Sequence, residues 1–313
     1  MRVWYAAIAI VAALILALPL LGSSYQVYVA ELILINIVAA IGLNLLTGNC
    51  GQISLCHASL MAIGAYTTAL LTTRLSVTYI VALPVGVAVT TLIGASLGYP
   101  ARRLSGLYLA LVTLGFLEVV SIVIEEFPDI SGGVRGLSLA KPDLAGWRLN
   151  AGALYYFVLG VTVLAIHAGV NLQRSRYGRA FNAVRQSVIV AQTLAIPSGR
   201  TKLLAFSIAA AFAGLAGGLF TAVVGFIDPT EFDISASLRQ ITFIAVGGLG
   251  SVLGSVVGAT VLTLLPEALR GVKEYSDVVY GAILLGALML APKGVVGVIA
   301  TLVGRSGGKA RLP

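Results

Sequence analysis

Runs of about 20 apolar residues recur along almost the whole chain, and this repetition restricts the folds open to it. Only 10% of its 313 residues are charged and 58% are hydrophobic, whereas a soluble domain carries about 25% charged residues. A helix of about 20 apolar residues spans the hydrocarbon core of a bilayer. The sequence therefore predicts an all-α, polytopic membrane protein in which residues 1–313 form a single transmembrane domain.

The individual runs define the expected spans. The continuous runs cover residues 3–21, 27–46, 53–71, 79–99, 104–127, 152–172 and 203–227. Two further candidates follow at residues 238–265 and 278–291. Because the longer of these two is long enough to be divided, we expect about ten membrane segments in all.

Basic residues predict the orientation, since short loops rich in Lys and Arg stay on the cytoplasmic side of a membrane. They cluster at Arg2, at residues 102–103, in segment 174–202 and in the tail 293–313. If all four clusters are cytoplasmic, the last third of the chain must cross an even number of times. The glycine cluster at residues 247–250 then divides the run 238–265 into two short segments, like the broken helices of transporters. Both termini are predicted to be cytoplasmic, and the loop 128–150 to be extracytoplasmic.

The polar segment 174–202 is unusual because it contains six Lys and Arg residues and no Asp or Glu. With residues placed at about 100° each, its middle forms one amphipathic helix that Pro197 ends. The polar face holds Arg179, Asn182, Arg185, Gln186, Gln192 and Thr193, with Ile189 as an apolar residue among them. Such a helix is either a passive element on the lipid surface or an element that a soluble partner grips.

Several polar residues inside the runs are candidates for chemistry or transport. Glu118 lies in the middle of run 104–127, where a carboxylate marks either a functional site or a hydrogen-bonded structural residue. Arg239 either faces a cavity or anchors the chain at the membrane surface. His57 lies one helical turn after Ser54, and we expect it to make a structural hydrogen bond. The candidates for a translocation pathway are Asn44, Gln52, His57, Glu118 and Gln240.

Some familiar sites are excluded by residue type and spacing. The two cysteines, Cys50 and Cys56, are too few for a disulfide framework, and Cys56 lacks the spacing of a haem attachment motif. No His and Cys residues have zinc-binding spacing, so no metal site is predicted. The glycines near Lys309 do not form a P-loop, and we expect no bound ATP. The net charge of +8 follows from the cytoplasmic loops and does not indicate nucleic-acid binding.

Residues 42–71 read GLNLLTGNCGQISLCHASLMAIGAYTTALL, and this stretch resembles a signature of LivM-type permease subunits of branched-chain amino-acid ABC transporters. Three further stretches, 131–137, 177–219 and 238–270, resemble other parts of the same family in the same order. The resemblance implies the type II fold of ABC importer permeases. It also implies a multi-pass protein of a prokaryotic plasma membrane, with no cofactor of its own.

The partners implied by the resemblance are a second permease subunit, two cytoplasmic ATPase subunits that bind ATP and Mg²⁺, an external solute-binding protein and a small amino-acid substrate. The family motif at the outer loop matches Ser131, Gly132, Gly133 and Gly136. The segment 174–202 corresponds to the family's coupling loop, which favours docking over a passive role. The residues expected to couple to the ATPase are Arg179, Asn182, Arg185, Gln186, Ile189 and Gln192.

The chain departs from the family pattern at a few positions. Cys56 stands where the family usually has Gly, and Ala195 replaces another Gly. Gln186, Val188 and Gln192 stand where acids are usual, which explains why the coupling loop is wholly basic.

Two other functions are compatible with the polar residues alone. A proton-coupled secondary transporter would use Glu118, and an intramembrane enzyme would use His57, Cys56 and Ser54. The basic amphipathic segment favours the ABC permease over both. The scaffold itself does not fix the substrate among branched-chain amino acids, other amino acids, urea and small amides, nor does it decide between a homodimer and a heterodimer of permeases.

Overall fold

The computed structural model describes residues 16–104, 106–139, 143–144, 147–148, 150–268 and 281. Most of the expected first span, the expected span 278–291 and the basic tail 293–313 lie outside the described residues. The elements are α2 (Ser24–Leu43), the π-helical η1 (Asn44–Asn49), α3 (His57–Thr73), α4 (Tyr79–Ala101), α5 (Leu107–Glu126), α6 (Pro128–Ser131), the 3₁₀ turn η2 (Gly133–Arg135), β1 (Leu137–Ser138), β2 (Asp143–Leu144), β3 (Trp147–Arg148), α7 (Ala151–Arg174), α8 (Arg176–Gln186), α9 (Val188–Thr193), α10 (Ser198–Val224), β4 (Phe226–Ile227), the 3₁₀ turn η3 (Pro229–Phe232), α11 (Ile234–Gly247) and α12 (Val252–Ala268).

The long apolar runs form helices, as the sequence predicts. In the described part of the chain, five helices are long and apolar enough to cross a membrane. The helices α11 and α12 pass the same test only when taken together, as a pair bent at a short break. The five are α2 continued by η1, α4, α5, α7 and α10. The chain is therefore a polytopic helical membrane protein. The expected total of about ten segments and the cytoplasmic termini stay predictions.

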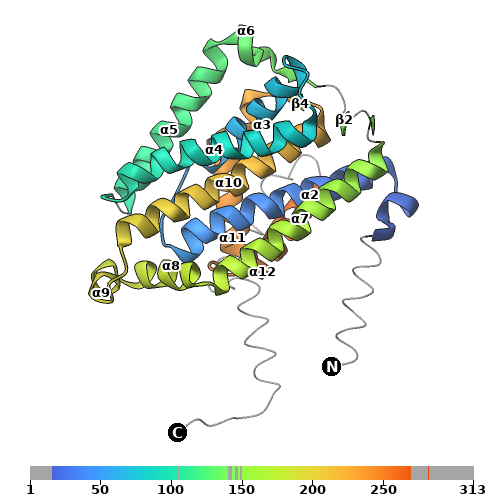
Figure 1. The fold of residues 1–313 in the computed structure, drawn as a ribbon. Helices are drawn as coiled ribbons and strands as arrows, with labels where there is room; N and C mark the ends of the chain where they lie inside the picture. The colour runs from blue at the N-terminus through green and yellow to red at the C-terminus, as the bar shows by residue number, and fades with distance from the viewer. Residues whose placement is uncertain are drawn as a thin grey trace, which may run out of the picture.

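Helix α10 lies at the centre of the bundle and packs against α2, α3 and α4 (Figure 1). Small residues make this close packing possible. A Cβ atom on Gly64 of α3 would lie 2.5 Å from the Cα atom of Gly214 on α10, so the two backbones touch. Side chains as small as these allow membrane helices to approach closely without a hydrophobic driving force.

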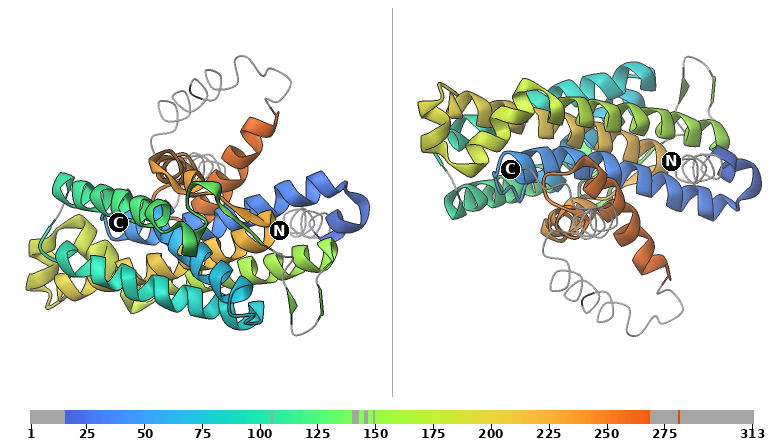
Figure 2. Two further views of the ribbon diagram at one scale, coloured as in Figure 1. Left: turned by 90° about the horizontal axis from the view of Figure 1, so that it is seen from above. Right: turned by 90° about the horizontal axis from the view of Figure 1, so that it is seen from below.

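The run 238–265 is divided in two, as the charge clusters require. Helices α11 and α12 meet at a break where the chain turns through 119°. Gly248 and Gly250 adopt φ angles of 132° and 82° there, which side chains rarely tolerate. Helix α12 then returns beside α2, with Asn36 of α2 donating to Thr263 at 3.0 Å. Figure 2 shows the α11–α12 pair on one side of the bundle.

The expected third span begins later than predicted. Helix α3 starts at His57 rather than at residue 53, and residues 51–56 are not helical. Gly51 has a φ of 72°, which ends the preceding helical segment. The backbone of the connecting segment is satisfied by protein groups, since the Leu55 amide donates to Thr113 of α5 at 3.0 Å. Irregular backbone at membrane depth is tolerated only against protein or water in this way.

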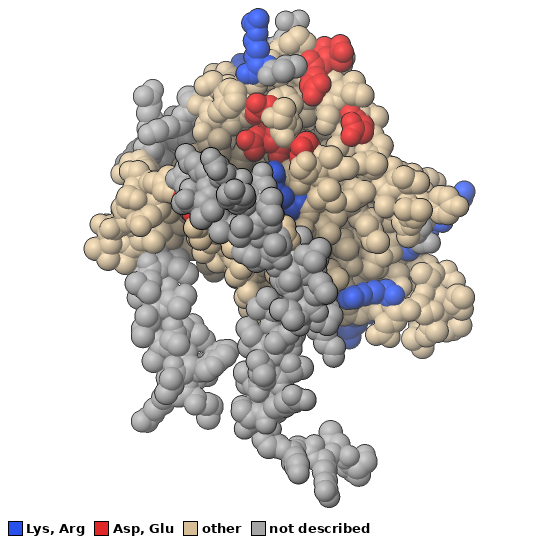
Figure 3. All heavy atoms as spheres, turned by 180° about the vertical axis from the view of Figure 1, so that it is seen from behind, with Lys and Arg blue, Asp and Glu red and all other residues tan. Residues whose placement is uncertain are grey.

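The two ends of the bundle differ in character. Helices α8 and α9 lie at one end, and the short pair β1–β4 lies with α6 toward the other (Figure 1). On the face drawn in Figure 3, the acidic side chains gather at one end, whereas basic side chains are seen at both ends. The acidic cluster thus marks one end of the bundle on this face.

Candidate functional site

The basic segment 174–202 forms two short helices where the sequence predicts one. Helix α8 ends at Gln186, and Ser187 adopts an extended conformation before α9 begins. The Ser187 hydroxyl accepts a hydrogen bond from the Val190 amide at 3.3 Å and caps α9. The prediction of a continuous helix was wrong because serine is a better N-cap than a helix interior residue.

Helix α8 buries its apolar side chains Phe181 and Val184, while most of its polar face, including Arg185, is exposed. Two of its polar side chains nevertheless contact η1, where α2 becomes π-helical. The Arg185 guanidinium donates to the carbonyl of Gly48 in η1. The Asn49 amide lies 3.4 Å from the Asn182 amide oxygen of α8. Gln173, at the end of α7, donates to the Gly250 carbonyl at the α11–α12 break. Helix α8 is therefore hydrogen-bonded to η1, and its neighbour α7 is hydrogen-bonded to the α11–α12 break.

The π-helical segment η1 and the α11–α12 break are also hydrogen-bonded to each other through Asn44, which is 2% exposed. Its amide nitrogen lies within hydrogen-bond distance of the Gly248 and Ser251 carbonyls and of the Ser255 hydroxyl, at 3.2, 2.9 and 2.8 Å. Its amide oxygen accepts from the Gly250 amide at 2.7 Å. A candidate pathway residue thus lies buried as a clamp between η1 and the α11–α12 break.

The opposite surface of this segment is exposed and largely apolar. In α9 and the turn after it, Ile189 is 75% exposed and Leu194 is 66% exposed. Arg179 and Gln186 are also exposed, whereas Gln192 donates to Ser198 at 3.0 Å. Of the six residues expected to couple to the ATPase, all but Asn182 are exposed, and three of them, Asn182, Arg185 and Gln192, also bond other elements of the chain.

Among the remaining pathway candidates, the structure places Gln240 at a cavity. His57 and Gln52 are buried, with the His57 Nε2 atom donating to the Ala39 carbonyl at 3.0 Å and Gln52 donating to the Cys50 carbonyl at 3.3 Å. Glu118 lies on the exposed face of α5. Gln240 is 6% exposed and lines a cavity between α2, α3, α10, η3 and α11.

The residues of the enzyme hypothesis do not form a catalytic relay. Ser54 and Cys56 lie 3.2 Å apart, and both are fully buried. The His57 Nε2 atom bonds the backbone of α2 instead of either group. Within the residues that the structure describes, no three His, Cys, Asp or Glu side chains form a group that could hold a metal ion.

The outer-loop motif forms a rigid turn. The Ser131 hydroxyl donates to the Phe127 carbonyl at 2.9 Å and accepts from the Gly133 amide at 3.1 Å. Gly132, Gly133 and Gly136 all have positive φ, at 81°, 56° and 70°. The turn places β1 against β4, with Leu137 opposite Ile227. Residues 137–139 therefore lie beside the segment that directly follows α10.

The sequence does not predict that two charged side chains, Glu231 and Arg239, line the same cavity. Glu231 of η3 lines it beside Arg239 and Gln240 of α11, together with apolar residues of three other helices. The proximity of Arg239 to a cavity was one of two interpretations open from the sequence. No periodic signal connects Glu231 to it, because Glu231 belongs to a 3₁₀ turn.

Comparisons with known proteins agree with this architecture. The model of the family described as "Branched-chain amino acid transport system / permease component" matches residues 25–288. LivM, the high-affinity branched-chain amino acid transport system permease protein of Escherichia coli K12, is 34% identical over 92% of this chain and 74% of that protein. Its counterpart from Salmonella typhimurium LT2 is 33% identical over 90% and 72%. The Salmonella typhimurium permease LivH is 26% identical over 82% of this chain and 90% of its own length.

No solved structure matches the chain significantly. The family match covers far more than half of the chain, and the LivM relatives exceed 30% identity over most of both sequences. The relatives are transport subunits, and neither the secondary-transporter nor the enzyme hypothesis is favoured. The chain belongs to the family of permease components of branched-chain amino acid transport systems.

Proposed function

We propose that this chain is one of two transmembrane subunits of an ATP-binding-cassette importer for branched-chain or related amino acids. Its partners are a second permease subunit, two cytoplasmic ATPase subunits and an external solute-binding protein, in the plasma membrane of a prokaryote. The family and its LivM relatives support this assignment. ATP and Mg²⁺ bind to the ATPase subunits and not to this chain.

The observation that carries the mechanism is the set of hydrogen bonds between α8 and the broken helices. Arg185 bonds Gly48, and Asn182 meets Asn49 at the same turn. A displacement of α8 therefore acts directly on η1, and through Asn44 on the α11–α12 break. An ATPase dimer that binds one position of α8 more tightly than the other shifts the permease between its inward-open and outward-open states.

The exposed surface of α9 supports docking rather than a passive role on lipid. Val188, Ile189, Val190 and Leu194 form an apolar patch at the end of the bundle that carries α8. Apolar patches rimmed by polar and charged residues mark protein interaction sites. Here the rim is basic, so the complementary ATPase surface is apolar with acidic residues around it. The acidic residues would then lie on the ATPase and pair with this basic rim, because the coupling loop has no acidic residues of its own.

The opposite end supplies the contact with the binding protein. The β1–β4 pair fixes the outer loop beside residues 228–233, which carry Asp228, Glu231 and Asp233. A rigid turn loses little conformational entropy on binding, and this favours recognition of a soluble partner.

The proposed function is tested by reconstituting the full importer in proteoliposomes and measuring leucine uptake driven by internal ATP. In the same preparation, Ile189→Asp is expected to abolish co-purification of the ATPase subunits, since a new carboxylate in a packed apolar contact is strongly unfavourable. Leu75→Asp is the matched control, because Leu75 is 68% exposed in the turn after α3. Wild-type ATPase recovery with Ile189→Asp would remove α9 from the docking role.

A further inference from the structure

A cavity of about 180 Å³, open to solvent on one side, lies among α2, α3, α10, η3 and α11. It is smaller than the about 300–1,000 Å³ that is typical of sites for drug-sized ligands, so it suits only a small molecule. Six of its lining residues carry the chemistry, namely Met61, Phe220, Glu231, Phe232, Arg239 and Gln240. The cavity is built from five separate elements.

One face of α11 is directed into this cavity. Ala236, Arg239, Gln240 and Phe243 line it, and their spacing of three and four residues places them on a single helical face. The Asp233 side chain fixes the start of α11 by accepting from the Ala236 amide at 2.8 Å. The position of the charged and polar groups is thus set by a capped helix rather than by a loose loop.

Two opposite charges line the cavity from different elements. Glu231 belongs to η3 and Arg239 to α11, and both side chains are exposed. Within the residues that the structure describes, the two do not form an ion pair with each other. A free amino acid carries one negative and one positive group, so this pair offers an attractive partner to each.

Gln240 supplies an unsatisfied buried acceptor. Its amide nitrogen donates to the Met61 sulfur at 2.8 Å. Its amide oxygen is buried and has no hydrogen-bond partner in the described part of the chain. Buried polar atoms in folded proteins are almost always paired. Because this oxygen is enclosed in the cavity wall, the N–H donors of an ammonium group reach it only when the Gln240 side chain turns toward the cavity.

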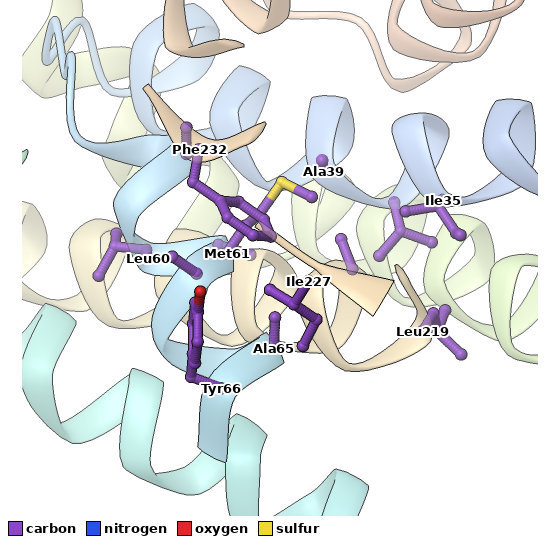
Figure 4. Packing of buried hydrophobic residues seen from close by; sticks show 14 of the residues in the cluster. Ile35, Ala39, Leu60, Met61, Ala65, Tyr66, Leu219, Ile227 and Phe232 are labelled. Carbon is purple, nitrogen blue, oxygen red and sulfur yellow. The ribbon is translucent and has the colours of Figure 1, made fainter. Parts of the chain in front are cut away.

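The remaining wall is apolar and partly aromatic. Phe220 and Phe232 meet edge to face with ring centroids 5.6 Å apart. Met61 of α3 lies beside Phe232, as Figure 4 shows. Flexible methionine side chains adapt to aliphatic groups of different shape. This wall therefore suits branched aliphatic side chains and offers no partner to a charged one.

We propose that this cavity is the site at which the permease itself contacts the transported amino acid. Arg239 pairs with the α-carboxylate and Glu231 with the α-ammonium group, to which Gln240 adds its amide oxygen once its side chain turns toward the cavity. Met61, Phe220, Phe232 and Phe243 surround the aliphatic side chain. The inference rests on the proposed function and adds the residues by which this subunit recognises a zwitterionic aliphatic substrate.

Protection from chemical modification tests the site without depending on transport. In the full importer without its binding protein, and with Cys50 and Cys56 replaced by Ala, a Leu32→Cys variant places a thiol in the cavity wall. Millimolar leucine is expected to slow its modification several-fold. Leucine amide lacks the carboxylate and 4-methylpentanoate lacks the ammonium group, so both should protect far less. The control is Leu238→Cys, since Leu238 is 49% exposed on α11 and does not line the cavity.

Charge variants then assign the two ends of the substrate. Arg239→Gln should raise the leucine concentration needed for half protection about tenfold and remove the preference for leucine over leucine amide. Glu231→Gln should instead remove the preference over 4-methylpentanoate, and Arg239→Lys should restore part of the lost affinity. Arg103→Gln and Glu126→Gln are charge-matched controls at exposed positions outside the cavity.

The outcomes separate this inference from the proposed function. An importer that accumulates leucine with ATP, yet gives equal modification rates at Leu32→Cys with and without leucine, would overturn the cavity assignment alone. Protection that is the same for all three ligands would also overturn it. An importer that shows no ATP-driven leucine uptake would overturn the proposed function itself.

Discussion

The Asn44 side chain accepts a hydrogen bond from the Gly250 backbone amide at 2.7 Å, although 206 positions separate the two residues. The bond joins the π-helical end of α2 to the break between α11 and α12. The same asparagine also meets two backbone carbonyls of that break and the Ser255 hydroxyl. One side chain therefore holds together the two irregular segments that α8 and α7 contact.

The first prediction concerns the strength of this clamp. Asn44→Ala leaves the Gly250 amide and the Gly248 carbonyl without this partner, and an unsatisfied buried polar group costs about 1–3 kcal/mol. We expect a lower apparent unfolding temperature of the purified complex in detergent, followed by tryptophan fluorescence or a thermal-shift assay. Asn171→Ala serves as the control, because Asn171 is exposed and bonds only His167 at 2.8 Å. Equal shifts in both variants would contradict the clamp.

The second prediction separates coupling from docking. Arg185→Gln removes the charged donor to the Gly48 carbonyl, and hydrogen bonds with a charged partner are worth about 1.5–3 kcal/mol. We expect the ATPase subunits to remain attached and to hydrolyse ATP, while leucine uptake per ATP falls about tenfold. Uptake and phosphate release are measured in the same proteoliposomes.

Arg176→Gln is the control for this experiment. Arg176 is exposed and donates to the hydroxyl of the neighbouring Tyr177 at 3.3 Å. It should leave the ratio of uptake to ATP hydrolysis near the wild-type value. If Arg185→Gln transports as efficiently as the wild type, the bond to Gly48 does not transmit the motion of α8.

The third prediction concerns the proton requirement. Glu118 lies on an exposed face of α5 and outside the cavity that Gln240 lines. An importer driven by ATP needs no proton to move, so Glu118→Gln should keep most uptake in proteoliposomes with internal ATP and no pH gradient. Glu118→Leu should lose more, because Leu cannot form the hydrogen bond that Gln still offers to a neighbouring helix. Accumulation that needs a pH gradient, together with an inactive Glu118→Gln variant, would restore the secondary-transporter hypothesis.

The fourth prediction is the orientation in the membrane. Single cysteines in a background without Cys50 and Cys56 are probed with an impermeant thiol reagent. Ser138→Cys and Asp233→Cys should react in intact cells, whereas Arg179→Cys should react only in inverted vesicles, because basic loops stay inside. The reverse pattern would invert the topology.

The same charge rule extends to residues that the structure does not describe. Tyr275→Cys should react from outside, and Arg305→Cys should react only in inverted vesicles. Protection of Tyr275→Cys in intact cells, together with labelling of Arg305→Cys there, would contradict the two separate crossings assigned to α11 and α12.

Much of the helical framework could be predicted from the sequence because apolar length alone selects a membrane helix. The break at residues 247–250 could also be predicted, since the basic clusters demand an extra crossing and glycine permits the turn. The start of α3 could not, because residues 53–56 are as apolar as a helix. Their non-helical conformation depends on contacts such as the bond from Leu55 to Thr113.

The candidate sites were less predictable for a related reason. Helical periodicity places Arg185 on the polar face of α8, and a polar face ordinarily points to water. Only the folded chain reveals that the Gly48 carbonyl lies within reach of this side chain. The cavity shows the same limit, since Glu231 and Arg239 converge only after η3 and α11 have packed against α2 and α3.

The long separation between Asn44 and Gly250 also sets the order of events during biosynthesis. A ribosome adds about 5–20 residues per second, so α2 enters the membrane roughly 10–40 s before the α11–α12 break is made. During that interval the Asn44 amide has none of the native partners that this break later provides. Insertion and maturation are thus separate stages for this chain. A nascent chain arrested before residue 248 would be integrated in the bilayer, yet it would remain a substrate for membrane quality-control proteases.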